Sequence, residues 1–226
     1  MDNNKDFISR QIDVCKNDKK LVELIAKLAL APRNYYAHIH AASDKVDGEK
    51  RAYSLIGIVI QDYSDSSKDA VRSTANITPA IADYIFNAVR RGVLNFHYSE
   101  EKLLPNKDST TGRNPVTKLT ICRVDTVKKD GKEEKRRQPW FIGIENGTAV
   151  AATNAKGGSY AEKDSFISEK NLVMSLTDVD MYRMFYNATH FIANWEAAYV
   201  PQHIYESEAA LAQIIESKKN GSNATV

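Results

Sequence analysis

The residues best suited to chemistry lie in one short stretch, KKDGKEEKRRQPWFIGIENG, which runs from Lys128 to Gly147. It begins with crowded cations around an Asp-Gly pair and passes at once into the aromatic pair Trp140 and Phe141. Basic groups that follow phosphates, beside aromatic rings on which bases stack, are what a protein needs to hold a single-stranded nucleic acid. The stretch therefore indicates a binding hairpin. The alternative is a solvated hairpin tip with Trp140 in the core.

An earlier segment, DKVDGEKRAYSLIGIVI at residues 44–60, repeats the pattern of an Asp-Gly turn, cations, an aromatic residue and an Ile-Gly-Ile strand. We predict phosphate contacts from the basic residues of both stretches and their surroundings: Lys128, Lys129, Lys135, Arg136, Arg137, Lys156 and Arg51. Stacking faces are predicted at three aromatic residues: Trp140, Tyr160 and Tyr53. Taken together, these residues predict a nucleic-acid interface without catalytic groups.

A second candidate site is the pair His38 and His40, because two imidazoles on one face of a strand can share a metal ion. No further ligand is indicated, and two polar positions on a solvated strand face are the favoured interpretation. The chain has neither a Walker loop nor a G-x-S-x-G elbow. We therefore expect no enzyme, no cofactor and no metal, and keep an enzyme site near these histidines as the third hypothesis.

Composition supports a folded domain rather than a polycation. The chain has 226 residues, 42% apolar and 27% charged, with a net charge of only +2, so anion binding must come from local clustering. Its two cysteines lie far apart, which argues against a disulfide framework and for a reducing compartment. The polar start and the absence of an apolar run of about 18 residues predict a cytoplasmic protein with no membrane contact.

Periodicity predicts an α+β protein whose first part starts with helix. Residues 1–17 are polar and read as partly frayed or loosely helical, and KKLVELIAKLALA, residues 19–31, has the spacing of an amphipathic helix that ends at Pro32. NYYAHIHAA and YSLIGIVI alternate like strands. Thr78 and Pro79 mark the start of a helix that ends at Gly92.

The second part restarts after residues 96–115, whose polar and turn-forming composition predicts a linker. VTKLTICRVDTV and WFIGIENG are predicted strands on either side of the charged turn, with weaker strands at GGSYAEKDSFIS and LVMSL. An aromatic helix is predicted from Asp178 to a stop before Pro201, followed by a last helical segment and a polar tail.

The order of these features predicts two pseudo-repeated antiparallel β-sheet units, each closed by a helix, with extra N- and C-terminal helices. The alternative is a chance match of short motifs. The predicted organisation has five parts: an N-terminal helical segment at 1–32, a first sheet-plus-helix repeat at 33–95, a linker at 96–115, a second repeat at 116–200, and a C-terminal helix with a polar tail at 201–226.

The hairpins around Gly48 and Gly131, the strands YSLIGIVI and WFIGIENG, and the helices starting at Thr78 and Thr177 resemble the Whirly fold and a duplicated positive cofactor four domain. The resemblance covers roughly residues 33–200. It implies binding of single-stranded DNA or RNA along sheet surfaces and hairpins, and homo-oligomers formed through the helices.

The leading hypothesis is a non-enzymatic single-stranded nucleic-acid-binding protein, with DNA as the first expectation. The alternative is a structural or protein-interaction module of a phage or mobile element that oligomerises through its aromatic helix at 178–199.

Overall fold

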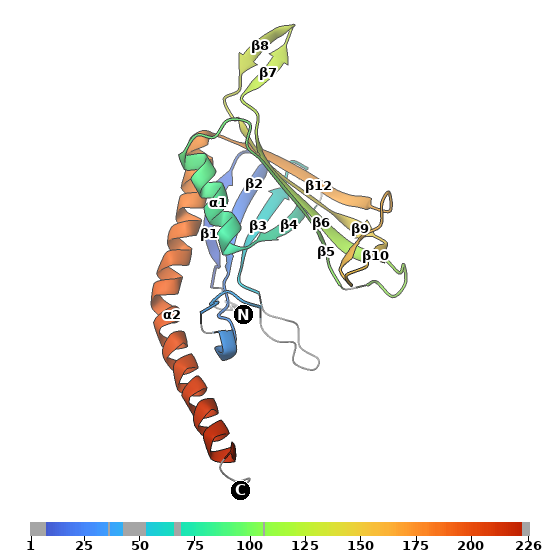
Figure 1. Ribbon diagram of the computed structural model, residues 1–226. Coiled ribbons are helices and arrows are strands. Elements are labelled where there is room, and N and C mark those ends of the chain that lie inside the picture. The colour runs from blue at the N-terminus through green and yellow to red at the C-terminus, as the bar shows by residue number, and fades with distance from the viewer. Residues whose placement is uncertain (1–7, 36, 43–52, 66–68, 106, 223–226) are drawn as a thin grey trace, which may run out of the picture.

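The computed structural model describes residues 8–35, 37–42, 53–65, 69–105 and 107–222. These residues form an α+β protein in which four antiparallel sheets accompany two α-helices (Figure 1). Two of the sheets have four strands each, and the other two are small two-stranded hairpins. Within this part of the chain, no helix is both long and apolar enough to cross a membrane.

The first large sheet, sheet 1, is a meander of neighbouring strands: β1 (Gln11–Lys16), β2 (Lys20–Lys27), β3 (Leu55–Asp62) and β4 (Val71–Ile77). Helix α1 (Pro79–Arg90) follows it in the chain. As predicted, Thr78 caps the start of α1, and its side chain accepts a hydrogen bond from the Ile81 amide at 3.3 Å. Gly92, with a φ of +63°, lies just beyond its end.

The second large sheet, sheet 2, is also a meander: β5 (His97–Leu103), β6 (Asn114–Arg123), β9 (Trp140–Ala149) and β12 (Ile167–Leu176). Helix α2 (Asp178–Ser222) follows it. Two small hairpins interrupt the sheet: β7 (Thr126–Lys129) with β8 (Lys132–Lys135), and β10 (Ala151–Thr153) with β11 (Ser159–Ala161).

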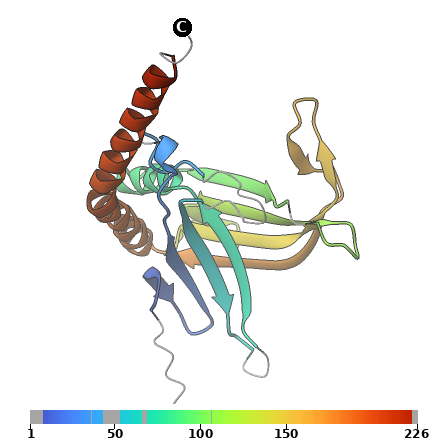
Figure 2. The same cartoon turned by 90° about the horizontal axis from the view of Figure 1, so that it is seen from below.

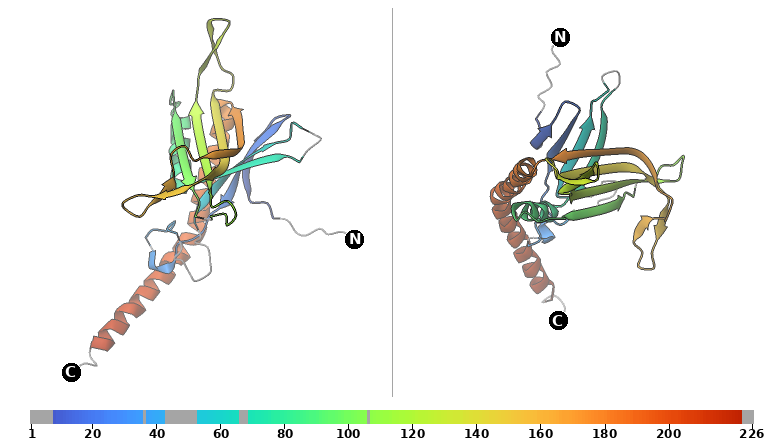
Figure 3. Two further views of the ribbon diagram at one scale, coloured as in Figure 1. Left: turned by 90° about the vertical axis from the view of Figure 1, so that its right-hand side faces the viewer. Right: turned by 90° about the horizontal axis from the view of Figure 1, so that it is seen from above.

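One hydrophobic core joins both sheets and both helices. Alternate residues of the central strands point into it, among them Ile56 and Ile58 of β3 and Ile142 and Ile144 of β9. The helices lie side by side along one flank of the sheets, and α2 extends well beyond them (Figures 2 and 3). Because the two helices share one flank, the prediction of one closing helix for each sheet is not confirmed.

The two sheets are also tied together by a side-chain amide. Asn146 of β9 donates a hydrogen bond to the Thr74 carbonyl of β4 and accepts one from the Thr74 amide, both at 2.9 Å. The same Asn146 amide nitrogen lies 3.0 Å from the Thr117 hydroxyl of β6. The polar groups of β4 that point away from β3 at this residue are therefore paired across the sheet boundary.

The N-terminal helical segment predicted at 1–32 is wrong over its described part, which holds the hairpin of β1 and β2. Apolar residues at Leu21, Val22, Leu24 and Ile25 fit a helical face, but they fit a two-sided strand as well. Full-length pairing of β2 with β3 decides the outcome and buries Val22 and Leu24. Here tertiary pairing overrides the local propensity.

The strand predicted at NYYAHIHAA is wrong too, since a short 3₁₀ helix, η1 (Arg33–Tyr35), and turns occupy its described residues. The predicted turn at Asp47 and Gly48 lies outside the described residues. Residues 96–115, predicted to be a linker, contribute β5 and the start of β6. Phe96 and Tyr98 show why: these alternate positions pack against the core despite the polar composition of the segment.

The predicted stop before Pro201 is also wrong, because α2 is continuous from Asp178 to Ser222. Proline removes one helical hydrogen bond, and packing of the residues beyond it opposes that cost. Beyond Pro201, His203 and Ser207 are buried, and the Arg33 guanidinium of η1 contacts the Glu206 carboxylate at 2.7 Å. The resulting single helix replaces the separate C-terminal helix that the pattern indicated.

The strand predictions around both Ile-Gly-Ile triplets are confirmed, and each triplet lies on the third strand of its sheet in chain order. Each four-stranded sheet is followed by one helix. The origin of these halves by duplication stays a prediction, as does the division into domains.

Candidate nucleic-acid interface

The charged stretch forms a two-stranded arm, β7 with β8, that projects from the end of sheet 2 (Figure 1). Asp130 and Gly131 both adopt positive φ at its tip, +50° and +75°, the backbone of a tight hairpin turn. The predicted cations Lys128, Lys129 and Lys135 are exposed on it. The arm therefore presents long basic side chains to solvent, away from the core.

Arg136 lies at the root of the arm, where β8 gives way to sheet 2. Its Nε donates a hydrogen bond to the Thr126 carbonyl at 3.2 Å, and its guanidinium carbon lies 5.1 Å from the centre of the Phe141 ring. This cation–π contact orients both side chains on the sheet surface. Arg137, the next residue, is exposed.

Beyond Arg136, the face of sheet 2 that points away from the core forms a groove of about 460 Å³. Strand register arranges its lining in three rows across the strands: Cys122 with Phe141, then Thr120 with Gly143 and Val173, then Lys118 with Glu145 and Asn171. Successive rows lie about 6.6 Å apart along the strands. We call this surface the sheet 2 groove.

Glycine opens the middle of the groove. A Cβ added at Gly143 would meet the Val173 side chain at 3.4 Å and the Thr120 carbonyl at 3.9 Å, so any larger side chain would project into the groove. Burial raises the pKa of the neighbouring Cys122 thiol, which keeps it protonated at neutral pH. The first two rows therefore carry no charge, and the charged side chains Lys118 and Glu145 lie in the third row.

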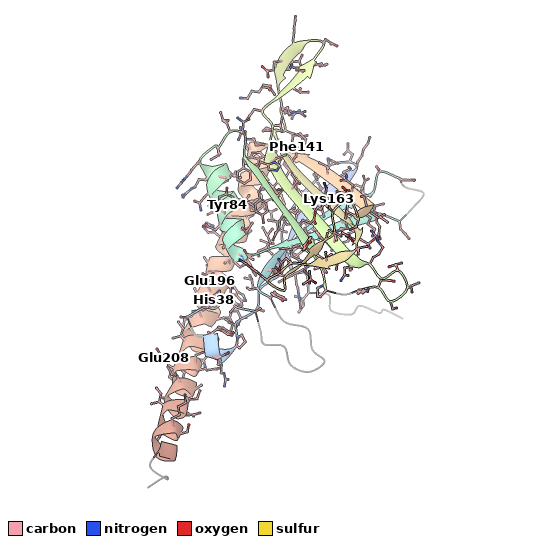
Figure 4. All side chains as sticks on the ribbon, turned by 45° about the vertical axis from the view of Figure 1, so that its right-hand side comes forward. His38, Tyr84, Phe141, Lys163, Glu196 and Glu208 are labelled. Carbon is pink, nitrogen blue, oxygen red and sulfur yellow. The ribbon has the colours of Figure 1, made fainter. Side chains whose placement is uncertain are left out.

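A cation and an aromatic ring meet at each end of the groove. At the arm end Arg136 lies against Phe141, and at the far end the Lys118 ammonium lies 3.8 Å from the centre of the Phe166 ring. Lys118 also contacts the Glu101 carboxylate at 3.5 Å. Figure 4 shows Phe141 near the root of the arm and Lys163, a neighbour of Phe166 in the chain, farther along the sheet.

Trp140 does not belong to this surface, so its prediction as a stacking face is corrected. Its side chain is 0% exposed and faces the core, because it alternates with Phe141 along β9. Its indole Nε1 donates a hydrogen bond to Asp178 at 2.8 Å, and its ring lies 5.6 Å from that of Phe96. The alternative interpretation, Trp140 as core, is the one the structure supports.

The other predicted site residues are spread over the molecule. Lys156 and Tyr160, the latter 50% exposed, lie on the β10–β11 hairpin at the opposite end of β9 from the arm. Tyr53, 52% exposed, precedes β3 in sheet 1. Arg51 lies outside the described residues. Among the predicted residues, Arg136 lines the groove. Lys128, Lys129 and Lys135 lie on the arm that extends from the same end of sheet 2.

Sequence reasoning missed Lys118, Glu145 and Phe166. A signal for the first two was available, since alternation along β6 and β9 puts them on the face opposite the apolar residues. Phe166 has no such signal, because it lies between β11 and β12 and meets Lys118 only through the chain reversal there.

The His38 and His40 pair does not form a strand-borne metal site. His38 is exposed, whereas His40 Nδ1 lies 2.7 Å from the Ser54 hydroxyl and its Nε2 lies 2.9 Å from the Glu196 carboxylate. Ser54 is only 5% exposed, so a substrate has no access to its hydroxyl. The described residues contain no cluster of three or more His, Cys, Asp or Glu side chains that could hold a metal.

Comparison with known proteins gives little beyond this geometry. No family model matches the chain, and no curated protein matches it. Among solved structures, one titled "Structure of the plant transcriptional regulator PBF-2" has a TM-score of 0.43 and 9% identity, covering 85% of this chain and 86% of that chain. This likeness is too weak to carry an argument, and the resemblance to the Whirly fold stays a prediction.

Proposed function

We propose that the protein binds single-stranded nucleic acid, DNA in the first place, along the sheet 2 groove. The observation that carries the proposal is the pairing of a cation with an aromatic ring at each end of one apolar groove, Arg136 with Phe141 and Lys118 with Phe166. The arm adds exposed lysines at the first end. A protein that binds a single strand needs cations that contact its phosphates and, beside them, aromatic rings on which its bases stack.

The same chemistry favours a single strand over a duplex. Bases in a duplex are already stacked and paired, so their faces are closed to Phe141 and Phe166. Each base stacked on an aromatic ring contributes about 1–3 kcal/mol, and neighbouring phosphates release counterions when Lys or Arg neutralises them. Glu145 lies four positions after Phe141 on β9, a span of about 13 Å. That length accommodates a few nucleotides.

Fluorescence anisotropy with labelled 12-mers, single-stranded and double-stranded, at low and at moderate salt, tests the proposal. We expect tighter binding of the single strand and a log–log salt slope that becomes shallower by about 1.4 when Lys118→Gln and Arg136→Gln are combined, since each lost single-strand contact contributes about 0.7. The control combines Lys16→Gln and Lys19→Gln, which removes two exposed cations from the β1–β2 hairpin. Equal slopes in both variants contradict the proposal.

A second candidate function, a module that self-associates through α2, is favoured by an exposed aromatic row. The Tyr182 and Tyr186 rings stack at 5.8 Å, Tyr186 meets His190 at 3.8 Å, and Phe86 of α1 lies 5.6 Å from Tyr182. Both tyrosines keep more than a third of their surface exposed. A contiguous exposed aromatic surface of this kind is typical of protein interfaces.

Light scattering on the eluted protein measures this self-association. We propose that the wild type is a homo-oligomer and that Tyr186→Glu converts it to monomers, since a carboxylate within an aromatic contact is desolvated without a partner. Tyr205→Glu, an exposed position farther along the same helix, is the matched control and leaves the oligomer intact. A monomeric wild type would rule this candidate out.

A further inference from the structure

The far row of the sheet 2 groove contains an acid between two other polar groups. Strand register sets Glu145 of β9 directly opposite Lys118 of β6 on one side and Asn171 of β12 on the other. All three side chains line the groove. An acid on a surface proposed to hold a polyanion needs a physical explanation.

Glu145 is half-buried, and its carboxylate has no hydrogen bond or ion pair with any residue that the structure describes. Lys118, the nearest cation by register, is engaged elsewhere, with the Glu101 carboxylate at 3.5 Å and the Phe166 ring at 3.8 Å. The Glu145 oxygens are therefore free acceptors that face the groove. A partly desolvated acceptor costs free energy until a donor meets it.

Phosphates cannot supply that donor, because they carry negative charge and only accept hydrogen bonds. The base edges can. Cytosine and adenine each present an exocyclic amino group on the edge that is unpaired in a single strand, and a carboxylate accepts well from it. Thymine and uracil have a carbonyl oxygen at the corresponding position, which repels the carboxylate, and their one donor on this edge is the ring N3–H between two carbonyl groups. The Asn171 amide beside Glu145 can donate to a ring nitrogen or accept a second hydrogen bond.

We infer that Glu145 makes the sheet 2 groove select bases that carry an exocyclic amino group over thymine and uracil, with phosphates running along Arg136 and Lys118 and bases turned toward Glu145. This inference rests on the proposed function. It assigns Glu145 the role of a specificity-determining residue rather than a source of affinity.

The test is anisotropy with labelled dC₁₂, dA₁₂ and dT₁₂ at one salt concentration, on the wild type and on Glu145→Gln. We expect the wild type to bind dC₁₂ and dA₁₂ tighter than dT₁₂ by about 5- to 100-fold. Glutamine keeps the shape but adds a donor that thymine O4 can accept, so the three affinities should converge to within about twofold. The ratio between strands is the readout, because loss of one negative charge raises all three affinities together.

Glu134→Gln is the matched control. It removes the same charge from an exposed position on β8, outside the groove, and should preserve the wild-type ratio. Binding of all three strands with equal affinity by the wild type, or an unchanged ratio in Glu145→Gln, overturns the inference and leaves the proposed function standing. Absence of binding by any strand at low salt overturns the proposed function itself.

Discussion

Sheets 1 and 2 carry the same short sequence on their third strands, but only one of the two surfaces is open. Leu55-Ile56-Gly57-Ile58 of β3 and Phe141-Ile142-Gly143-Ile144 of β9 both send their isoleucines into the core and their glycine outward. In sheet 2 the glycine leaves a groove. In sheet 1 the Lys27 side chain covers the glycine, with its Cε 3.0 Å from where a Cβ of Gly57 would lie.

The difference lies in what surrounds each glycine. The Lys27 ammonium is held over Gly57 by the Asn76 side chain at 2.8 Å, so the long aliphatic stem fills the gap. Around Gly143 the neighbours are the short side chains Thr120 and Val173, which cannot reach across it. A glycine on a sheet surface therefore makes a site only where its neighbours leave the space unfilled.

The largest expected effect comes from filling both gaps with the same residue. Gly143→Val places a β-branched side chain across the groove and disturbs bases on both aromatic rings, so we expect a loss of about 2–6 kcal/mol, at least about 30-fold in Kd. Gly57→Val displaces only the flexible end of Lys27. Anisotropy should show wild-type affinity for Gly57→Val, and thermal unfolding should show both proteins folded. Equal losses in the two variants would mean that the groove is not the binding surface.

The next effect compares Phe141 and Leu55, which lie two positions before the glycine on their strands. Phe141→Ala removes one stacking face and should weaken single-strand binding by about 5- to 150-fold, or ~1–3 kcal/mol. Leu55→Ala removes a half-buried side chain at the corresponding place in sheet 1 and should leave binding unchanged. We expect each variant to lose only about 1 kcal/mol of unfolding free energy, measured by urea denaturation, since both side chains are partly exposed. An unaffected Phe141→Ala would remove stacking from the proposal.

A smaller effect uses the two cysteines, one in each sheet. Cys122 lines the sheet 2 groove, whereas Cys15 of β1 lies near Asp180 of α2. Burial raises the pKa of both thiols, for Cys15 with a further contribution from Asp180, so both alkylate mainly at alkaline pH. Saturating oligonucleotide should slow alkylation of Cys122, followed by peptide mass spectrometry, and leave the rate at Cys15 unchanged. Protection of Cys15 alone would place the ligand on the wrong sheet.

The smallest effect concerns Lys27, whose side chain covers Gly57 of sheet 1. Burial first, and then Arg72, lowers the pKa of Lys27. Lys27→Met keeps a chain over Gly57 but loses the hydrogen bond to Asn76, so we expect a change of at most about 1 kcal/mol in unfolding free energy and no change in binding. The unfolded chain binds this proton more tightly than the folded protein. Wild-type stability relative to Lys27→Met should therefore rise with pH between the lowered pKa and the ordinary value of 10.5.

Local chemistry allowed much of this arrangement to be predicted. The Asp130-Gly131 turn, the cap at Thr78 and both Ile-Gly-Ile strands depend on neighbouring residues, and the structure has all of them. The predictions that were wrong concern segments whose structure depends on pairing with residues distant in the sequence. Nothing within residues 19–31 indicates that β3 will pair with β2 along its whole length.

The candidate site was predictable in kind but only partly in place. Clustered cations indicated the arm, yet which of Trp140 and Phe141 faces outward depends on the register of β9 against β6. Lys118 and Phe166 meet only because the chain reverses between β11 and β12, a feature with no local pattern. The groove exists because Gly143 has no side chain and its neighbours Thr120 and Val173 do not fill the space. It could be recognised only once the strand register showed which residues those neighbours are.

The Asn146 amide has a consequence for solubility. β4 is an edge strand of sheet 1, and the free N–H and C=O groups of an edge invite pairing with a strand of another molecule. By bonding both groups of Thr74, the Asn146 side chain occupies the place that an invading strand would take. One side-chain amide thus protects the edge strand β4 against pairing with a strand of another molecule, and so against amyloid-like sheet extension.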